Sequence, residues 1–128
     1  NDVSDKMILF CNKQNTGQII TFDIESNIIL DESTIFEFNI NHSCKIDNNK
    51  FLFSSEKSIY LFNYLNNSFV KVYQTSQDIV DLDFDVLSNK VFVMQSQKLE
   101  IITYPDFNYI TSVESENTLK SIELLYGY

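Results

Sequence analysis

Apolar and polar residues alternate over several short stretches of this chain, and turn-forming residues separate the stretches. The clearest case is residues 79–85, in which Leu82 and Phe84 alternate with aspartates. A period of two places such apolar side chains on one face of a half-buried β-strand. Ser88-Asn89, a pair typical of turns, follows this stretch. The pattern therefore predicts a strand over residues 79–85.

The same pattern predicts strands along the whole chain, whereas no stretch has the roughly 3.6-residue period of an amphipathic helix. Pro105 interrupts the pattern, because proline has no amide hydrogen to donate to a sheet. We therefore expect an all-β fold. The predicted strands are residues 7–11, 19–23, 40–46, 51–54, 59–62, 69–73, 79–85, 91–94, 99–103, 109–113 and 119–125.

The stretches repeat at a spacing of about 40 residues, which we call the repeat period. Segments 19–23 (IITFD), 59–63 (IYLFN) and 99–103 (LEIIT) align at this offset. Repeats of about 40 to 45 residues with about four strands each are typical of WD-type β-propeller blades. Residues 17–23, GQIITFD, also resemble the WD-repeat strand that runs from a glycine to Trp-Asp, with Phe22 in place of the tryptophan.

A closed propeller needs roughly 4 to 8 blades, whereas 128 residues supply about three. We therefore expect a WD40-like β-propeller fold in which this chain forms about three blades of a larger ring of about seven. The remaining blades would come from elsewhere in the polypeptide or from a partner. The expected units are residues 1–38, 39–76 and 77–117, and residues 118–128 would start a further blade.

Two details of the alignment predict local structure. Lys50 and Lys90 are one repeat period apart, but Lys6 precedes Lys50 by four positions more than one period. The extra residues predict a longer surface loop around residues 12–16. The apolar positions of residues 119–125 lie one period beyond those of the strand at 79–85, so they predict the first strand of the further blade.

His42 is the only histidine, and it aligns with Leu82 at the repeat period. Cys44 follows two residues later, so both side chains should share one face of the strand at 40–46. Such a pair occurs in zinc sites and in nucleophile–base pairs, but the sequence offers no further Cys or His at ligand spacing. A buried structural histidine is therefore favoured. Cys11 and Cys44 are too few for a disulfide framework, which favours a reducing, intracellular location.

The chain is acidic, since 18 Asp and Glu against 9 Lys and Arg give a formal net charge of −9. Nucleic-acid affinity depends on Lys and Arg that neutralise phosphates. We therefore expect no direct grip on nucleic acid by this segment. No apolar run approaches the roughly 18 to 20 residues of a membrane helix, and the start has no basic and apolar signal segment. No membrane association is expected.

Four aspartates in and just before the strand at 79–85 are the candidate functional residues. Asp81, Asp83 and Asp85 alternate as the oxygen ligands of a calcium loop do, but the glycine and the distal glutamate of such a loop are missing. We expect a row of acids on the polar side of a strand instead. Together with Asp78, such a row is a candidate site for a basic protein partner. The sequence predicts no catalytic, cofactor-binding or metal-binding residue.

Four segments in the second part of the chain resemble consecutive landmarks of one WD-repeat family. They are residues 58–62 (SIYLF), 79–84 (IVDLDF), 91–95 (VFVMQ) and 118–122 (TLKSI). They are similar to the last blades of the WD-repeat, non-catalytic subunit of tRNA (guanine-N7-)-methyltransferase. The resemblance implies a nuclear scaffold that binds and stabilises a catalytic subunit, which holds S-adenosylmethionine and contacts tRNA. The family's basic contacts to its partner lie mainly in other blades, so no binding residue is implied here.

Two other functions stay open. One is a different intracellular WD-like platform for protein–protein interaction. The other is a fragment of a β-propeller enzyme, whose site would lie in the central channel. An enzyme needs convergent titratable groups, and this segment offers only His42 and the strand aspartates. We therefore expect a non-catalytic segment without a cofactor, which exposes apolar sheet faces and needs a partner when it is alone.

Overall fold

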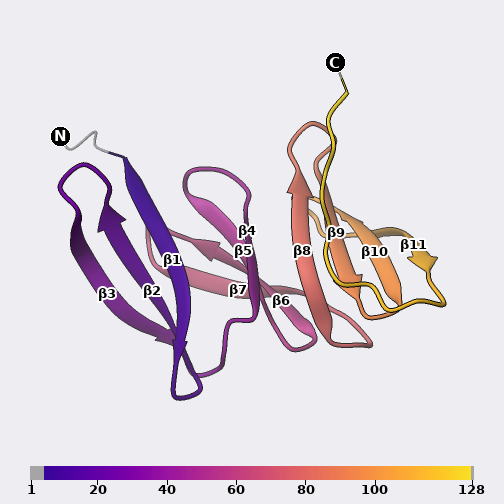
Figure 1. Ribbon diagram of the computed structural model, residues 1–128, viewed down its shortest axis with the longest axis horizontal. Helices are drawn as coiled ribbons and strands as arrows, with labels where there is room; N and C mark the ends of the chain where they lie inside the picture. The colour runs from indigo at the N-terminus through magenta and orange to yellow at the C-terminus, as the bar shows by residue number, and fades with distance from the viewer. Residues whose placement is uncertain (1–4, 128) are drawn as a thin grey trace. The chain divides into compact units, whose positions relative to one another are not determined.

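Residues 5–127 are described by a computed structural model, apart from the side chains of Thr34 and Ile35. They form antiparallel strands and no helix (Figure 1), so none of them belongs to a helix long and apolar enough to cross a membrane. The all-β prediction is confirmed. The strands are β1 Lys6–Lys13, β2 Thr16–Asp23, β3 Ile28–Phe36, β4 His42–Lys45, β5 Lys50–Ser55, β6 Ser58–Asn63, β7 Ser68–Gln74, β8 Ile79–Asp85, β9 Lys90–Gln95, β10 Lys98–Thr103 and β11 Tyr109–Glu114.

The strands form three sheets in which each strand pairs with its neighbours in sequence. Sheet 1 has the order β1-β2-β3, sheet 2 the order β4-β5-β6-β7, and sheet 3 the order β8-β9-β10-β11. Several hairpin turns contain an asparagine with a positive φ angle, namely Asn27 (60°), Asn67 (53°) and Asn89 (54°). Asparagine tolerates this backbone conformation better than most residues, so its frequency in the chain suits a fold made of short hairpins.

The pairing register repeats with the period of the sequence. Phe22, Phe62 and Ile102 follow one another at the repeat period and occupy the same position in β2, β6 and β10. Strand β1 therefore corresponds to β5 and β9, and sheet 1 lacks, within the described residues, a counterpart of the first strands β4 and β8. The matched pairs are Met7 with Phe22, Phe51 with Phe62, and Val91 with Ile102.

Backbone hydrogen bonds outside the strands also repeat at this spacing. The Thr75 N–H donates to the Lys57 carbonyl at 2.8 Å, and the Ser115 N–H donates to the Gln97 carbonyl at 2.9 Å. The turns of sheet 3 and the chain segment that leaves it therefore have the same backbone bonds as those of sheet 2. The other matched bonds are Ile79 to Glu56 with Leu119 to Ser96, and Tyr64 to Asn49 with Tyr104 to Asn89.

Sheets 2 and 3 belong to one compact unit, which begins at Asn41, and they share one hydrophobic core. Leu52 and Ile59 of sheet 2 pack with Val91 and Ile102 of sheet 3, and all four side chains are fully buried. Burial of an aliphatic side chain of this size contributes about 1.5 to 3 kcal/mol. Strand β8 contacts both β4 and β5, so the two sheets stack face to face.

Sheet 1 forms the other compact unit, which ends at Ile40. Gly17 in β2 leaves room for the chain to close over this sheet, because a Cβ at position 17 would lie 2.7 Å from Phe36 Cδ2 and 2.9 Å from Ile40 Cγ1. Asn12 fixes the same segment. Its side-chain amide donates to the Ile40 carbonyl and its Oδ1 accepts from the Ile40 N–H, both at 2.6 Å.

The predicted surface loop at residues 12–16 is wrong. Strands β1 and β2 have eight residues each, and only Gln14 and Asn15 lie between them. Their φ angles of 50° and 67° fit a two-residue hairpin turn with both residues in the left-handed region. The corresponding strands β5 and β6 have six residues each. The extra residues therefore lengthen the hairpin by two residues per strand instead of forming a loop.

The predicted strand at residues 119–125 is also wrong, since these residues form no strand. Their path nevertheless follows that of β8, as the matched bond of Leu119 shows, and the Ile122 N–H donates to Asp81 Oδ2 at 2.9 Å. A β-strand requires a backbone ladder, and no described strand pairs with this segment. We call residues 119–125 the C-terminal segment; Figure 1 shows it in yellow alongside β8.

The alignment predicted that His42 corresponds to Leu82, and this prediction is wrong. His42 pairs with Ser54 and Asp81 pairs with Met94, and Ser54 and Met94 are one repeat period apart. His42 therefore matches Asp81. The cause is a turn between β8 and β9 that is one residue longer than the turn between β4 and β5. The pair Phe84–Val91 beside the turn between β8 and β9 is equivalent to the pair Lys45–Phe51 beside the turn between β4 and β5. The chain between Phe84 and Val91 is one residue longer than the chain between Lys45 and Phe51.

Candidate protein-interaction surface

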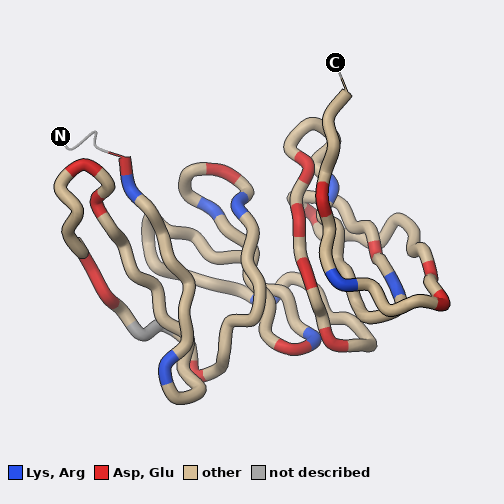
Figure 2. Tube along the Cα trace, in the orientation of Figure 1, with Lys and Arg blue, Asp and Glu red and all other residues tan. Residues whose placement is uncertain are grey.

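Three of the four predicted acids gather on β8, along which Figure 2 shows acidic residues in red. Asp81, Asp83 and Asp85 share one face of the strand, because side chains two residues apart point the same way, and all three are half-buried. Asp78 precedes the strand and is exposed. We call Asp81, Asp83 and Asp85 the acidic row. The sequence predicted a row of acids on the polar side of a strand, and in the structure this side is half-buried.

Backbone amides hold the first two carboxylates of the acidic row in place. Asp81 Oδ1 accepts from the Leu82 N–H at 2.9 Å, and its Oδ2 accepts from the Ile122 N–H at the same distance. Asp83 Oδ1 accepts from the Phe84 N–H at 2.8 Å. Both aspartates thus have fixed orientations, and Asp81 also anchors the C-terminal segment.

Asp85 stands at the turn that follows β8. The Ser88 hydroxyl donates to Asp85 Oδ2 at 2.5 Å, and this bond, with weaker help from the Tyr126 hydroxyl and the Leu87 N–H, lowers the pKa of Asp85. Its carboxylate therefore keeps its charge at lower pH than an ordinary aspartate. The contact with Tyr126 ties the chain beyond the C-terminal segment to the same row.

Apolar side chains flank the acidic row on the same face of sheet 3. The register places Phe92 and Met94 of β9 beside the row, and Leu99 and Ile101 of β10 beside them. Met94 is buried, and the other three are half-buried. We call Phe92, Met94, Leu99 and Ile101 the apolar flank. Apolar side chains bordered by charged ones have the composition of a protein-interface core with its polar rim.

Cys44 lies on the face of β4 that is turned toward sheet 3. Burial, followed by the negative charges of Asp83 and Asp81, raises the pKa of Cys44 to about 12. The thiol therefore stays protonated near neutral pH, which makes it a poor nucleophile and a poor metal ligand.

His42 is half-buried two residues before Cys44, on the same side of β4. Within residues 5–127, no three His, Cys, Asp or Glu side chains gather closely enough to hold a metal ion. The structure thus gives His42 and Cys44 a shared face, as predicted, and gives them no third partner of the kind that a metal site needs.

A buried polar cluster between sheets 2 and 3 was missed by the sequence prediction. Glu100 of β10 is 6% exposed, and its carboxylate accepts from the Tyr73 hydroxyl at 2.5 Å and from Gln95 Nε2 at 2.9 Å. Gln95 is fully buried, and its Oε1 accepts from the Gln77 N–H at 3.3 Å. Tyr73 comes from sheet 2 and the other side chains from sheet 3, so the cluster joins the two sheets.

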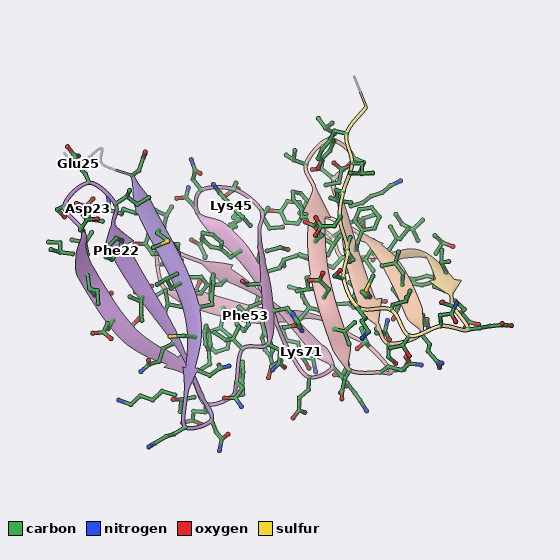
Figure 3. All side chains as sticks on the ribbon, viewed as in Figure 1. Phe22, Asp23, Glu25, Lys45, Phe53 and Lys71 are labelled. Carbon is green, nitrogen blue, oxygen red and sulfur yellow. The ribbon has the colours of Figure 1, made fainter. Side chains whose placement is uncertain are left out.

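The strand that resembles a WD repeat ends at the turn between β2 and β3, where Figure 3 labels Phe22 and Asp23. Asp23 is buried, and its Oδ2 accepts from the Ser26 N–H at 3.1 Å and also from the Ser26 hydroxyl. The carboxylate therefore closes the hairpin turn. Asp23 therefore has a structural role, as expected if the sequence repeat determines the fold.

No protein-family model and no curated protein matches this chain. Among solved structures, one described as the structure of U3-55K is similar with a TM-score of 0.70 over 94% of this chain at 8% identity. A hydrazine synthase chain of Kuenenia stuttgartiensis has a TM-score of 0.69 over 86% of this chain at 11% identity. This chain spans 43% of the first and 33% of the second.

At such low identity the likeness concerns the fold alone, and nothing in it names a tRNA methyltransferase subunit. It agrees with the sheets described above, which are antiparallel, formed by consecutive strands and repeated at the period of the sequence. The sheets of this chain are blades of a WD40-like β-propeller, as the sequence predicted.

Proposed function

We propose that this chain contributes blades to a β-propeller that serves as a non-catalytic platform for protein–protein interaction. The acidic row beside the apolar flank is the observation that supports this function best. Complementary charge guides a basic partner to such a surface, and the apolar side chains beside it add contact area. Asp78, exposed just before β8, extends the negative surface toward solvent.

A non-catalytic role is supported by what the buried polar groups do. Tyr73 and Gln95 both donate to the Glu100 carboxylate, and the cluster joins two sheets. Cys44 keeps its proton near neutral pH, because burial raises its pKa. A catalytic acid, base or nucleophile is instead poised near the working pH and open to substrate.

At a finer level, we propose that the partner is the catalytic subunit of a tRNA (guanine-N7-)-methyltransferase, in the nucleus. The support is the resemblance of residues 58–62, 79–84, 91–95 and 118–122 to the WD-repeat subunit of that enzyme. The net charge of −9 fits a division of labour in which the partner carries S-adenosylmethionine and contacts tRNA.

Affinity purification of the native protein, followed by mass spectrometry, tests the finer proposal. We expect a methyltransferase subunit in near-equal amount. Stable recovery of a different set of proteins would keep the platform and reject this partner. Recovery of no partner, together with activity of the purified protein toward a small substrate, would reject the platform in favour of an enzyme.

Removal of charge from the acidic row tests the proposed surface. Changing Asp78, Asp81, Asp83 and Asp85 to asparagine should weaken capture of the partner at low salt and flatten its salt dependence. A matched control removes the same number of exposed acids elsewhere, at Glu25, Asp31, Glu32 and Glu37. Equal affinity of the two variants at low salt would exclude the acidic row as the contact.

A further inference from the structure

The turn between β8 and β9 exposes two adjacent aliphatic side chains. Val86 is 64% exposed and Leu87 is 80% exposed. We call these two residues the turn tip. Turns are usually formed by Gly, Pro, Asn, Asp and Ser, whereas isolated apolar residues on a surface need no special role. Here two lie side by side outside the hydrophobic core, so their apolar character adds little to the burial that stabilises the fold.

The sequence repeat shows that a turn at this position does not require apolar residues. The equivalent turn between β4 and β5 belongs to the same compact unit, and its exposed residues are Asp47, Asn48 and Asn49. Asp47 stabilises that turn, because its Oδ1 accepts from the Asn49 N–H at 2.8 Å. Polar residues thus form the turn in sheet 2. The apolar turn tip of sheet 3 is therefore not a requirement of the hairpin.

Hydrogen bonds on both sides of the turn tip hold the turn in place. Asp85 Oδ1 accepts from the Leu87 N–H at 3.4 Å, and Asp85 Oδ2 accepts from the Ser88 hydroxyl at 2.5 Å. Beyond the tip, the Asn89 carbonyl accepts from the Tyr104 N–H at 2.9 Å, which ties this turn to the next hairpin of the same sheet. A contact residue that is already ordered loses little conformational entropy when a partner binds.

The turn tip borders the acidic row. Asp85, the last residue of β8, directly precedes Val86. The Tyr126 hydroxyl donates to the same carboxylate, and Tyr126 is 49% exposed, so an aromatic side chain lies beside Asp85 as well. Residues 79–95 carry three aspartates and one lysine, Lys90, which leaves an excess of negative charge. An apolar surface next to this charge fits a basic protein surface better than an acidic one.

We propose that the turn tip is an anchor for the partner of the platform, and that this partner presents an apolar pocket bordered by Lys or Arg. Leu87 enters the pocket, while the basic residues contact Asp85 and the rest of the acidic row. The inference rests on the proposed platform function and names the kind of partner that its surface fits. Burial of an exposed aliphatic side chain supplies affinity, and the carboxylates beside it orient the partner.

The affinity for the partner measures what the turn tip contributes. The probe is the protein that is recovered in near-equal amount from the native source, purified and titrated against the full chain by calorimetry. Leu87→Asn should raise the dissociation constant by about 10-fold or more, because the burial of the leucine is lost. The salt dependence should stay the same, because no charge changes. Asparagine suits a turn, so the variant should keep the β-sheet circular dichroism of the parent.

Leu65→Asn is the matched control, because Leu65 is 74% exposed in the turn between β6 and β7. It makes the same change in another sheet and should alter the dissociation constant by less than about 2-fold. An effect of Leu87→Asn no larger than that of the control would overturn the anchor.

The variant with asparagine at Asp78, Asp81, Asp83 and Asp85 separates this inference from the proposed function. If it weakens binding and Leu87→Asn does not, the platform stands and the anchor is rejected. If Leu87→Asn weakens binding and the removal of the four charges does not, the apolar pocket stands and its basic border is rejected. If neither change weakens binding, or no partner is recovered, the surface and its anchor are rejected together.

A photo-crosslinker at position 87 tests which surface receives the side chain. Leu87 is replaced by benzoylphenylalanine, which is apolar as leucine is, and the complex with the purified partner is irradiated. Mass spectrometry should place the adduct on an apolar segment of the partner that is flanked by Lys or Arg. The control carries the same group in place of Leu65. Adducts on a second copy of this chain, on an acidic segment of the partner, or in equal yield from both positions would overturn the proposal.

Discussion

Glu100 shows how a single residue departs from its sequence pattern. It stands between Leu99 and Ile101 in β10, where a charged residue would ordinarily face solvent. It is buried instead, because the Tyr73 hydroxyl from the neighbouring sheet and the Gln95 side chain both donate to its carboxylate. The sequence signal for this cluster is a single polar residue at a strand position that faces the core.

Removal of the Tyr73 hydroxyl tests this cluster. Tyr73→Phe takes one donor from a buried carboxylate, so the free energy of unfolding should fall by about 1.5 to 3 kcal/mol in urea denaturation. Tyr109→Phe is the matched control, because the Tyr109 hydroxyl bonds to Ser112 Oγ at 3.0 Å on the surface, and its effect should stay below about 0.5 kcal/mol. Equal effects would deny the cluster a stabilising role.

Cys44 predicts how stability responds to alkaline pH. Its pKa is raised from the ordinary thiol value of 9.0 to about 12, mainly by burial. Above pH 9 the unfolded chain loses the thiol proton while the folded chain keeps it. The unfolded state then binds fewer protons, so the free energy of unfolding falls as pH rises from about 9 toward 12. Cys44→Ser should flatten this fall, whereas Cys11→Ser, which leaves Cys44 in place, should retain it.

At the scale of strands, the sequence predicted the strand positions, which depend on the repeat period. It missed the pairing register, which depends on contacts between strands. The alternation and the repeat period located strands such as β5, β6 and β10 closely, because burial of one sheet face enforces both patterns. One extra residue in the turn after β8 was enough to misalign His42 with Leu82. A fixed offset cannot detect such an insertion without the register.

The two other errors at this scale have the same origin. The extra residues near Asn15 extend β1 and β2, because two left-handed residues suffice to close a hairpin of any length. The C-terminal segment has the pattern of a strand but no partner strand within the described residues. Asp81, Asp83 and Asp85 lie on the strand that the sequence predicted. The contacts of Asp81 with Ile122 and of Asp85 with Tyr126 join residues that are far apart in sequence.

The turn between β1 and β2 can be tested by substitution. Gln14 has a φ angle of 50°, which asparagine tolerates better than glutamine. Gln14→Asn should therefore raise the free energy of unfolding by about 0.5 kcal/mol or slightly more. Gln14→Val is the opposing control, because a β-branched residue in this region should lower it by about 1 to 2 kcal/mol. Thermal melts that ranked valine above asparagine would contradict the two-residue turn.

At the scale of the whole molecule, an excess of negative charge opposes compaction. The chain carries 18 acids and 9 basic residues, and three of the acids stand in a row on one strand. Repulsion among like charges destabilises a compact state and is screened by salt. The acidic balance therefore weakens the fold most at low ionic strength, where a bound basic protein would relieve it.

The midpoint of thermal unfolding should accordingly rise when NaCl increases from about 0.01 M to about 0.15 M, over which the screening length falls from about 30 Å to about 8 Å. The variant with asparagine at Asp78, Asp81, Asp83 and Asp85 should show a smaller rise than the parent. A midpoint that falls with salt over this range would mean that attractive ion pairs outweigh the repulsion.

The backbone bonds that recur with each repeat have a consequence for how such chains grow. Thr75 and Ser115 donate to equivalent carbonyls, so a duplicated copy of residues 75–114, spliced in directly after residue 114, would meet the same acceptor at its junction. An unequal crossover between repeats of the gene could then add or delete one whole sheet without breaking a single junction bond. Because of the spacing of those bonds, one sheet can be gained or lost as a whole in the gene, just as it packs as a whole in the protein.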